Sequence, residues 1–122
     1  MKRLFLLSVL LLAGLQWSPA DAQSIQAPPS RNVSGTITTG GSFQQIAPSA
    51  PGTRGGCLIV NPPTATETLY VYFGPTASAT TSNAYPVSAG GGISCGQGPN
   101  LVADAIQVEA ATTGHAFVAQ VQ

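Results

Sequence analysis

Residues Glu67–Gly74, with the sequence ETLYVYFG, decide the fold of this chain. Two sets of side chains alternate along them: Leu69, Val71 and Phe73 on one side, and Thr68, Tyr70 and Tyr72 on the other. Strict alternation places successive side chains on opposite faces of a β-strand, and β-branched and aromatic residues favour strands. The segment therefore predicts a half-buried strand, which the pair Gly74-Pro75 ends.

Short segments of similar character flank this strand, separated by turns rich in Gly, Pro, Ser and Thr. The predicted strands lie at 33–38, 42–46, 57–61, 68–73, 85–87, 93–95, 105–110 and 115–122. The apolar segment 57–61 is suited to a central strand, Pro86 favours an edge, and Phe43 is the expected anchor of 42–46. No helical period of useful length appears after the apolar N-terminal run. The pattern predicts an all-β fold over 32–122: a single small antiparallel β-sandwich or barrel-like domain of about seven to eight strands.

The N-terminus has the three-part pattern of a secretory signal peptide. Lys2 and Arg3 precede an apolar run at 4–15, and the small-residue triplet Ala20-Asp21-Ala22 follows. The run is shorter than the roughly 20 residues that a membrane-spanning helix needs. We therefore expect 1–22 to be a cleaved signal and 23–31 an extended leader, in a secreted or periplasmic protein. An uncleaved N-terminal anchor is the alternative.

The chain has two cysteines, Cys57 and Cys95. In an oxidising compartment an isolated pair usually forms a structural disulfide, and we expect one here. Two free buried thiols are the alternative. The spacing fits neither a zinc site nor a redox-active C-x-x-C motif.

Ionisable side chains are scarce after the predicted signal, which leaves two arginines, three carboxylates, one histidine and no lysine. This composition offers no basic surface for nucleic acid and no polybasic stripe for a membrane. It also offers few groups for acid–base catalysis. Asp104 and Glu109 are expected to be solvated charges, and His115 a surface or hydrogen-bonded residue. We predict no enzyme activity, no catalytic residues, no metal site and no cofactor.

Three tyrosines are the candidate binding residues. Tyr70 and Tyr72 lie on the side of their strand opposite Leu69 and Val71, where they either cover a packed sheet or form an aromatic platform for a sugar or a protein. Tyr85 joins them if the loops bring it near. The loop Ala47–Gly56 is a candidate contact for an enzyme that this chain would inhibit.

Three stretches resemble a small β-domain of tailed-phage and prophage structural proteins. They are GGCLIVNP (55–62), TLYVYFGPTASATT (68–81) and YPVSAGGGIS (85–94). With the closing segment 105–122, the resemblance covers about two thirds of the mature domain and consists of strand and turn chemistry. It implies a structural or surface-attachment β-sandwich.

The expected function is that of a secreted, non-catalytic structural or interaction module with a protein or glycan partner. A homo-oligomer is also open, since an exposed edge strand supports self-association. The alternatives are a carbohydrate-binding module that uses the tyrosines, and a small hydrolase or enzyme inhibitor.

Overall fold

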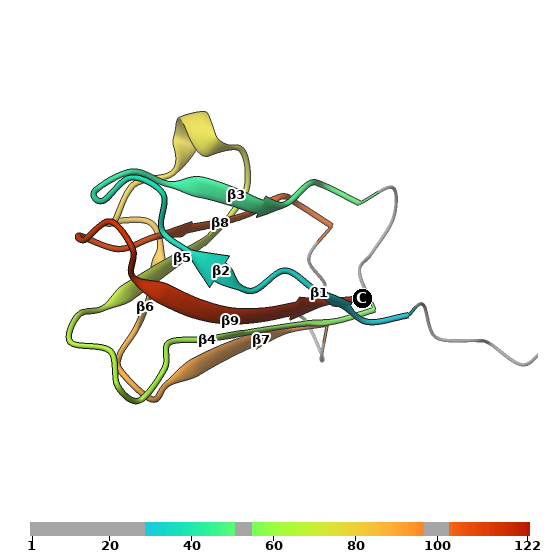
Figure 1. The fold of residues 1–122 in the computed structure, drawn as a ribbon. Helices are drawn as coiled ribbons and strands as arrows, with labels where there is room; N and C mark the ends of the chain where they lie inside the picture. The colour runs from blue at the N-terminus through green and yellow to red at the C-terminus, as the bar shows by residue number, and fades with distance from the viewer. Residues whose placement is uncertain (1–28, 51–54, 97–102) are drawn as a thin grey trace, which may run out of the picture.

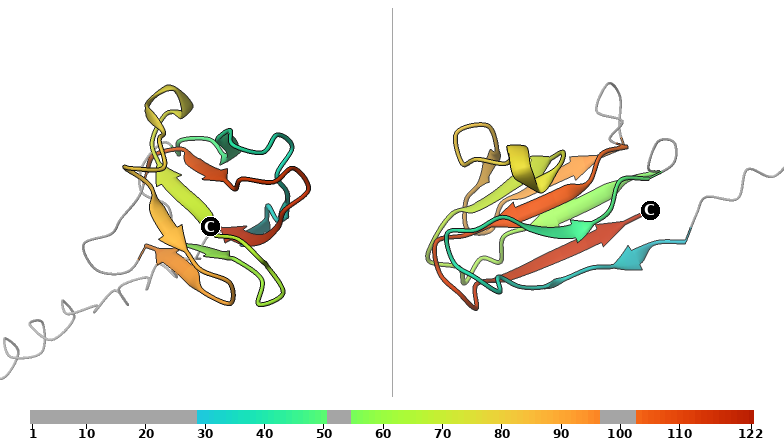
Figure 2. Two further views of the ribbon diagram at one scale, coloured as in Figure 1. Left: turned by 90° about the vertical axis from the view of Figure 1, so that its left-hand side faces the viewer. Right: turned by 90° about the horizontal axis from the view of Figure 1, so that it is seen from above.

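The structure of this protein is a computed structural model that describes residues 29–50, 55–96 and 103–122. These residues build two antiparallel sheets that face each other (Figures 1 and 2). They form nine strands, no α-helix and no closed barrel, so the predicted all-β sandwich is confirmed with more strands than expected. The predicted signal at 1–22 and residues 23–28 of the predicted leader lie outside the described residues.

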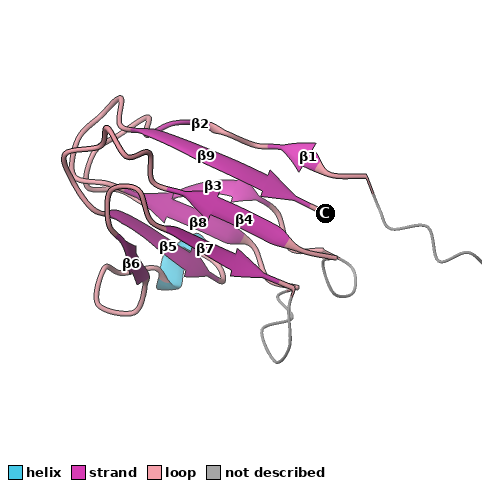
Figure 3. Ribbon diagram, turned by 90° about the horizontal axis from the view of Figure 1, so that it is seen from below, coloured by secondary structure: helices cyan, strands magenta, loops and turns pink. Residues whose placement is uncertain are grey.

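The larger sheet has the strand order β1-β9-β4-β7, with β2 also paired to β9. Its strands are β1 (Arg31–Asn32), β2 (Gly35–Thr36), β4 (Cys57–Val60), β7 (Gly92–Cys95) and β9 (Ala116–Val121). β4 lies between β9 and β7, the central position that its apolar sequence predicted. Figure 3 shows these strands from the outer side of the sheet.

The smaller sheet has the order β3-β8-β5-β6. Its strands are β3 (Gln44–Ala47), β5 (Leu69–Phe73), β6 (Tyr85–Val87) and β8 (Ile106–Glu109), and the short 3-10 helix η1 (Thr76–Ser78) follows β5. β6 lies at the edge, where Pro86 predicted it, because proline cannot donate a hydrogen bond to a second neighbour.

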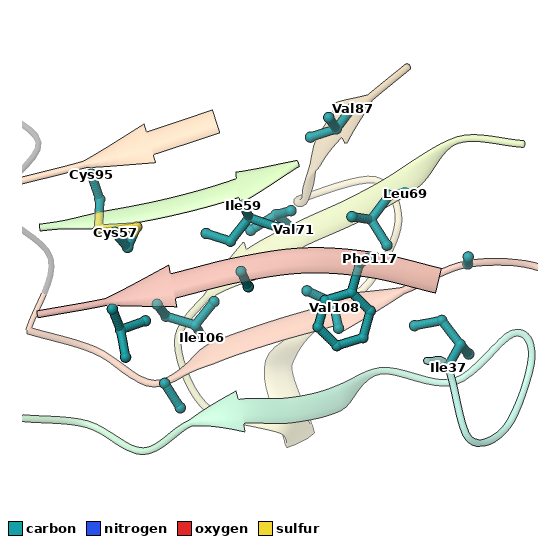
Figure 4. Packing of buried hydrophobic residues seen from close by; sticks show 14 residues of the cluster. Ile37, Cys57, Ile59, Leu69, Val71, Val87, Cys95, Ile106, Val108 and Phe117 are labelled. Carbon is teal, nitrogen blue, oxygen red and sulfur yellow. A yellow bond between two sulfur atoms is a disulfide. The ribbon is translucent and has the colours of Figure 1, made fainter. Parts of the chain in front are cut away.

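The core fills the space between the sheets (Figure 4). It consists of Ile37, Ala47, Cys57, Ile59, Leu69, Val71, Val87, Cys95, Ile106, Val108, Ala110, Phe117, Ala119 and Val121. The alternation predicted for β5 is confirmed, since Leu69 and Val71 point inward and are buried, and β9 alternates in the same way, with Phe117 and Val121 buried. Burying each such side chain contributes about 1.5–3 kcal/mol.

The strand predicted at 33–38 is wrong as one continuous element. β1 and β2 pair with β9 on either side of Val33 and Ser34. At the break, the Ser34 hydroxyl accepts a hydrogen bond from the Ala119 amide at 2.9 Å. A side-chain oxygen thus takes the place of a backbone carbonyl, because Ser competes locally for backbone partners. Arg31, the last residue of the predicted leader, lies within β1.

Phe43 does not anchor a strand in the core, contrary to the prediction. β3 begins one residue later, and Ala47 is its fully buried residue. The ring of Phe43 packs instead against Tyr72, with the ring centroids 6.4 Å apart. The reason is the register of β3, which a bulge between Gln45 and Ala47 shifts.

The predicted disulfide is confirmed. Cys57 and Cys95 face each other in the register of β4 and β7, and their Cα atoms lie 4.9 Å apart. Gly96 follows directly with a φ of +88°, and a Cβ there would lie 2.6 Å from the Gly56 Cα. Only glycine allows both this backbone conformation and this close approach of the two chain segments.

Candidate functional site

Tyr70 and Tyr72 lie on the outer face of the smaller sheet, half-buried. Their neighbours on the adjacent strand β8 are Glu109 for Tyr70 and Gln107 for Tyr72. The Tyr72 ring meets Phe43 edge-on, at an interplanar angle of 68°. Tyr72 thus packs within its own sheet, against Phe43, and is partly exposed.

Tyr85 lies on the other face of the same sheet. It stands opposite Val71 in the register of β5 and β6, and its ring is 5.9 Å from that of Phe73. Its exposed fraction is 56%. The structure therefore brings Tyr70 and Tyr72 to one face and places Tyr85 on the other, so the three tyrosines do not form one platform.

Gln107 is a fully buried polar residue on this outer face. Its amide donates to the Gly74 carbonyl at 3.0 Å, and its side-chain oxygen accepts from the Thr76 hydroxyl at 2.9 Å. Gln107 pairs with Tyr72 in the register of β5 and β8, which places both side chains on this face. No pattern in the sequence indicated that the loop carrying η1 would cover that position.

Glu109 is buried, with an exposed fraction of 5%, so its prediction as a solvated charge is wrong. β8 has neighbours on both sides, and the side chains around it leave little room for water. Among the described residues, the Glu109 Oε2 is the one buried side-chain oxygen or nitrogen without a hydrogen-bond partner. Burial, with a smaller contribution from the negative charge of Glu67, raises the pKa of Glu109 above its ordinary value of 4.5.

As pH rises and Glu109 ionises, the wild type should lose part of its free energy of unfolding. We expect the substitution Glu109→Gln to remove this loss. The folded state holds the proton of Glu109 more tightly than the unfolded chain does, so this group destabilises the fold as pH rises from 4.5 through its raised pKa. Urea unfolding at several pH values measures the effect. The difference between the variant and the wild type should grow with pH and then level off, whereas parallel curves would contradict the assignment.

His115 is held in a network with Glu67 and Asn61. Its Nδ1 lies 3.0 Å from the Glu67 Oε1, and its Nε2 lies 3.0 Å from the Asn61 Oδ1. The side chain of His115 has an exposed fraction of 6%. The network joins the start of β9 to the segments that follow β4 and precede β5.

The side chains of Asn61 and Glu67 make further hydrogen bonds that orient them toward the His115 ring. The Asn61 amide nitrogen donates to the carbonyls of Glu67 and Val87, both at 2.9 Å, so its Oδ1 is the atom that faces the His115 Nε2. The Glu67 carboxylate accepts from the amide and hydroxyl of Thr112 and also contacts the His115 Nδ1. Both ring nitrogens of His115 thus have a partner within the chain.

A cavity of ≈ 240 Å³ opens beside this network. Its walls are formed by Pro62, Thr64, Ala65, Thr66, His115 and Ala116. The hydroxyl groups among these residues belong to Thr64 and Thr66, and the His115 ring is hydrogen-bonded to Asn61 and contacts Glu67. The six residues thus form a small hollow against the His115 network.

The outer face of the larger sheet is the remaining candidate surface. Its central side chains, which we call the uncharged face, are Leu58, Val60, Ser94, Val118 and Gln120. Leu58 and Val118 are apolar and have exposed fractions of 46% and 47%. A cavity of ≈ 320 Å³ borders this face at the disulfide end. An apolar centre with polar neighbours and no charge is the composition found at the core of protein interfaces.

The other predicted residues contribute less to these sites. Asp104 is exposed, as expected. In the candidate inhibitor loop, Ala47 is buried at the end of β3, and residues 51–54 lie outside the described residues. No three His, Cys, Asp or Glu side chains within 29–50, 55–96 and 103–122 come together as a metal-binding group. In the same ranges, no helix has the length and apolar character needed to cross a bilayer.

Comparisons with protein-family models, with curated proteins and with solved structures find no match to this chain.

Proposed function

We propose that this protein is an exported, non-catalytic β-sandwich that acts as a structural or interaction module through its uncharged face. The observation that carries the proposal is the exposure of Leu58 and Val118, which lie diagonally across β4 and β9 on one face with uncharged neighbours. Contiguous exposed apolar patches mark interaction sites on soluble proteins.

The state of His115 supports the non-catalytic part of the proposal. It is the one histidine of the chain, and Glu67 and Asn61 occupy both of its nitrogens. A general base needs a free nitrogen within reach of the substrate. The basic and apolar start of the sequence and the Cys57–Cys95 disulfide support export, because disulfides persist in oxidising compartments. The resemblance to tailed-phage structural proteins supports a structural role.

The carbohydrate-binding alternative has less support. A sugar platform needs ring faces that are open and close together. Tyr72 packs edge-on against Phe43, and Tyr85 lies on the opposite face of the sheet. The alternative of a hydrolase would need a base other than His115.

The proposal is tested on the protein collected from the culture medium or the periplasm. We expect no turnover of chromogenic esters, glycosides or peptides. We also expect chemical cross-linking in the native envelope to yield adducts that Val118→Asp loses and that Val118→Thr, of equal shape and without charge, retains. Saturable turnover that disappears in His115→Ala would overturn the proposal, and so would adducts that are identical in both Val118 variants.

A further inference from the structure

Three of the four sheet edges in the described residues carry features that block pairing with another chain. Exposed edges are templates for added strands, and natural sheets blunt them with prolines, bulges, breaks or charges. β6 carries Pro86, and β3 has the bulge between Gln45 and Ala47. The edge formed by β1 and β2 is broken at Ser34, whose hydroxyl bonds to β9.

The fourth edge, β7, has none of these features. It contains Gly92, Ile93, Ser94 and Cys95, with no proline and no charge. Its four residues pair with β4 in an unbroken register, without a bulge. Within the described part of the chain, β4 is its one strand neighbour. Figure 3 shows β7 along the border of the larger sheet.

The disulfide fixes this open edge in place. Cys95 is the last residue of β7 and is bonded to Cys57 directly across from it on β4. Edge strands at the border of a small sheet fray easily, because they have few contacts to lose. A covalent tie to the central strand keeps β7 extended, and a preformed strand loses less entropy when another strand binds to it.

We propose that β7 pairs antiparallel with β7 of a second copy of this chain, which joins two five-stranded sheets into one. The inference deepens the proposed function by naming a partner, and it uses the free backbone edge of β7, which contributes Ser94 to the uncharged face, rather than the side chains of Leu58 and Val118. Self-pairing fits the chemistry of the strand, since a two-fold contact places each residue near its own copy and an uncharged strand meets no like charge.

The alternation of side chains limits the register of this contact. Ser94 lies on the outer face and Ile93 on the core side, and paired residues must share a face. Ser94 therefore stands opposite Ser94 of the second copy, or opposite its Gly92. In both arrangements the two Ser94 side chains are near each other on one face.

The test is the mass of the protein in solution, measured by light scattering after size exclusion. We expect the wild type to be a dimer, and Ser94→Glu and Ser94→Lys to weaken association about tenfold or more, because each opposes like charges. An equimolar mixture of the two variants should restore the dimer. Ser94 is exposed, so both variants should keep the circular dichroism spectrum of the wild type.

Gln120→Glu is the matched control, because it adds the same charge to the same sheet two strands from the edge. We expect this variant to remain a dimer. A wild type that stays monomeric up to about 1 mM overturns the proposal, and so does a dimer that Gln120→Glu breaks and Ser94→Glu does not. Neither outcome affects the proposed function, which the Val118 variants and the turnover assays decide.

Discussion

The variant Cys57→Ala/Cys95→Ala is expected to lose about 4 kcal/mol of its free energy of unfolding. The bridge spans 38 residues of sequence, and in the chain-entropy model such a loop restricts the unfolded chain strongly. Both cysteines also belong to the core cluster. Guanidinium unfolding of the variant and of the oxidised wild type at 25 °C measures the loss. For a domain of this size it is a large part of the total, which is about 5–15 kcal/mol.

Reduction of the wild type provides the control for this prediction. Measuring the wild type in a reductant, which leaves both thiols free and unmodified, should lower stability by a similar amount. A loss of less than about 1 kcal/mol in the double variant would show that the β4–β7 contact holds without the bridge. It would then also weaken the argument that the disulfide keeps the β7 edge extended.

The second large effect is expected for Asn61→Ala. Asn61 is fully buried and makes three side-chain hydrogen bonds, to the carbonyls of Glu67 and Val87 and to the His115 ring. Removing the side-chain amide of Asn61 takes one hydrogen bond from each of these three partners. Each buried polar group left unpaired costs about 1–3 kcal/mol. We expect a loss of about 3 kcal/mol in urea unfolding.

Asn83→Ala is the matched control for this experiment. Asn83 also bonds through its side chain, accepting from the Thr80 amide and donating to the Ser78 carbonyl, but these contacts are exposed. Water replaces exposed hydrogen bonds at little cost, so the loss should be about 0.5–1 kcal/mol. Equal losses in the two variants would contradict the structural role given to the Asn61–His115–Glu67 network. The ring nitrogen signals of His115 in ¹⁵N spectra should also move in Asn61→Ala and stay in place in Asn83→Ala.

The fold class was predictable because its signals are local. The alternation in β5 and β9 placed Leu69 and Phe117 in the core. Pro86 marked an edge strand, and the apolar sequence of β4 marked a central one. The disulfide was predictable because the chain has two cysteines in all. Phe43 was misplaced because the bulge in β3, which sets the register, leaves no sign in the sequence.

The candidate sites were less predictable, because their residues are distant in sequence. Asn61 lies 54 residues from His115, and nothing in either local pattern links them. Glu109 alternates with Val108 as a surface residue would. It is buried because β8 runs between two other strands and its outer face is covered. The exposure of Leu58 and the position of β7 at the edge of its sheet both depend on the order of the strands, which the local sequence does not show.

By itself, the sequence determined an all-strand chain with one cysteine pair and few ionisable groups. Alternation, turn residues and composition act over a few neighbours, so they can be read without knowing the fold. The tertiary structure was needed to show that β7 has a strand neighbour on one side alone among the described residues, that the Glu109 carboxyl is buried, and that Tyr85 lies on the face opposite Tyr70 and Tyr72. These properties depend on what packs against a residue from elsewhere in the chain, and alternation reports only the side to which that residue points.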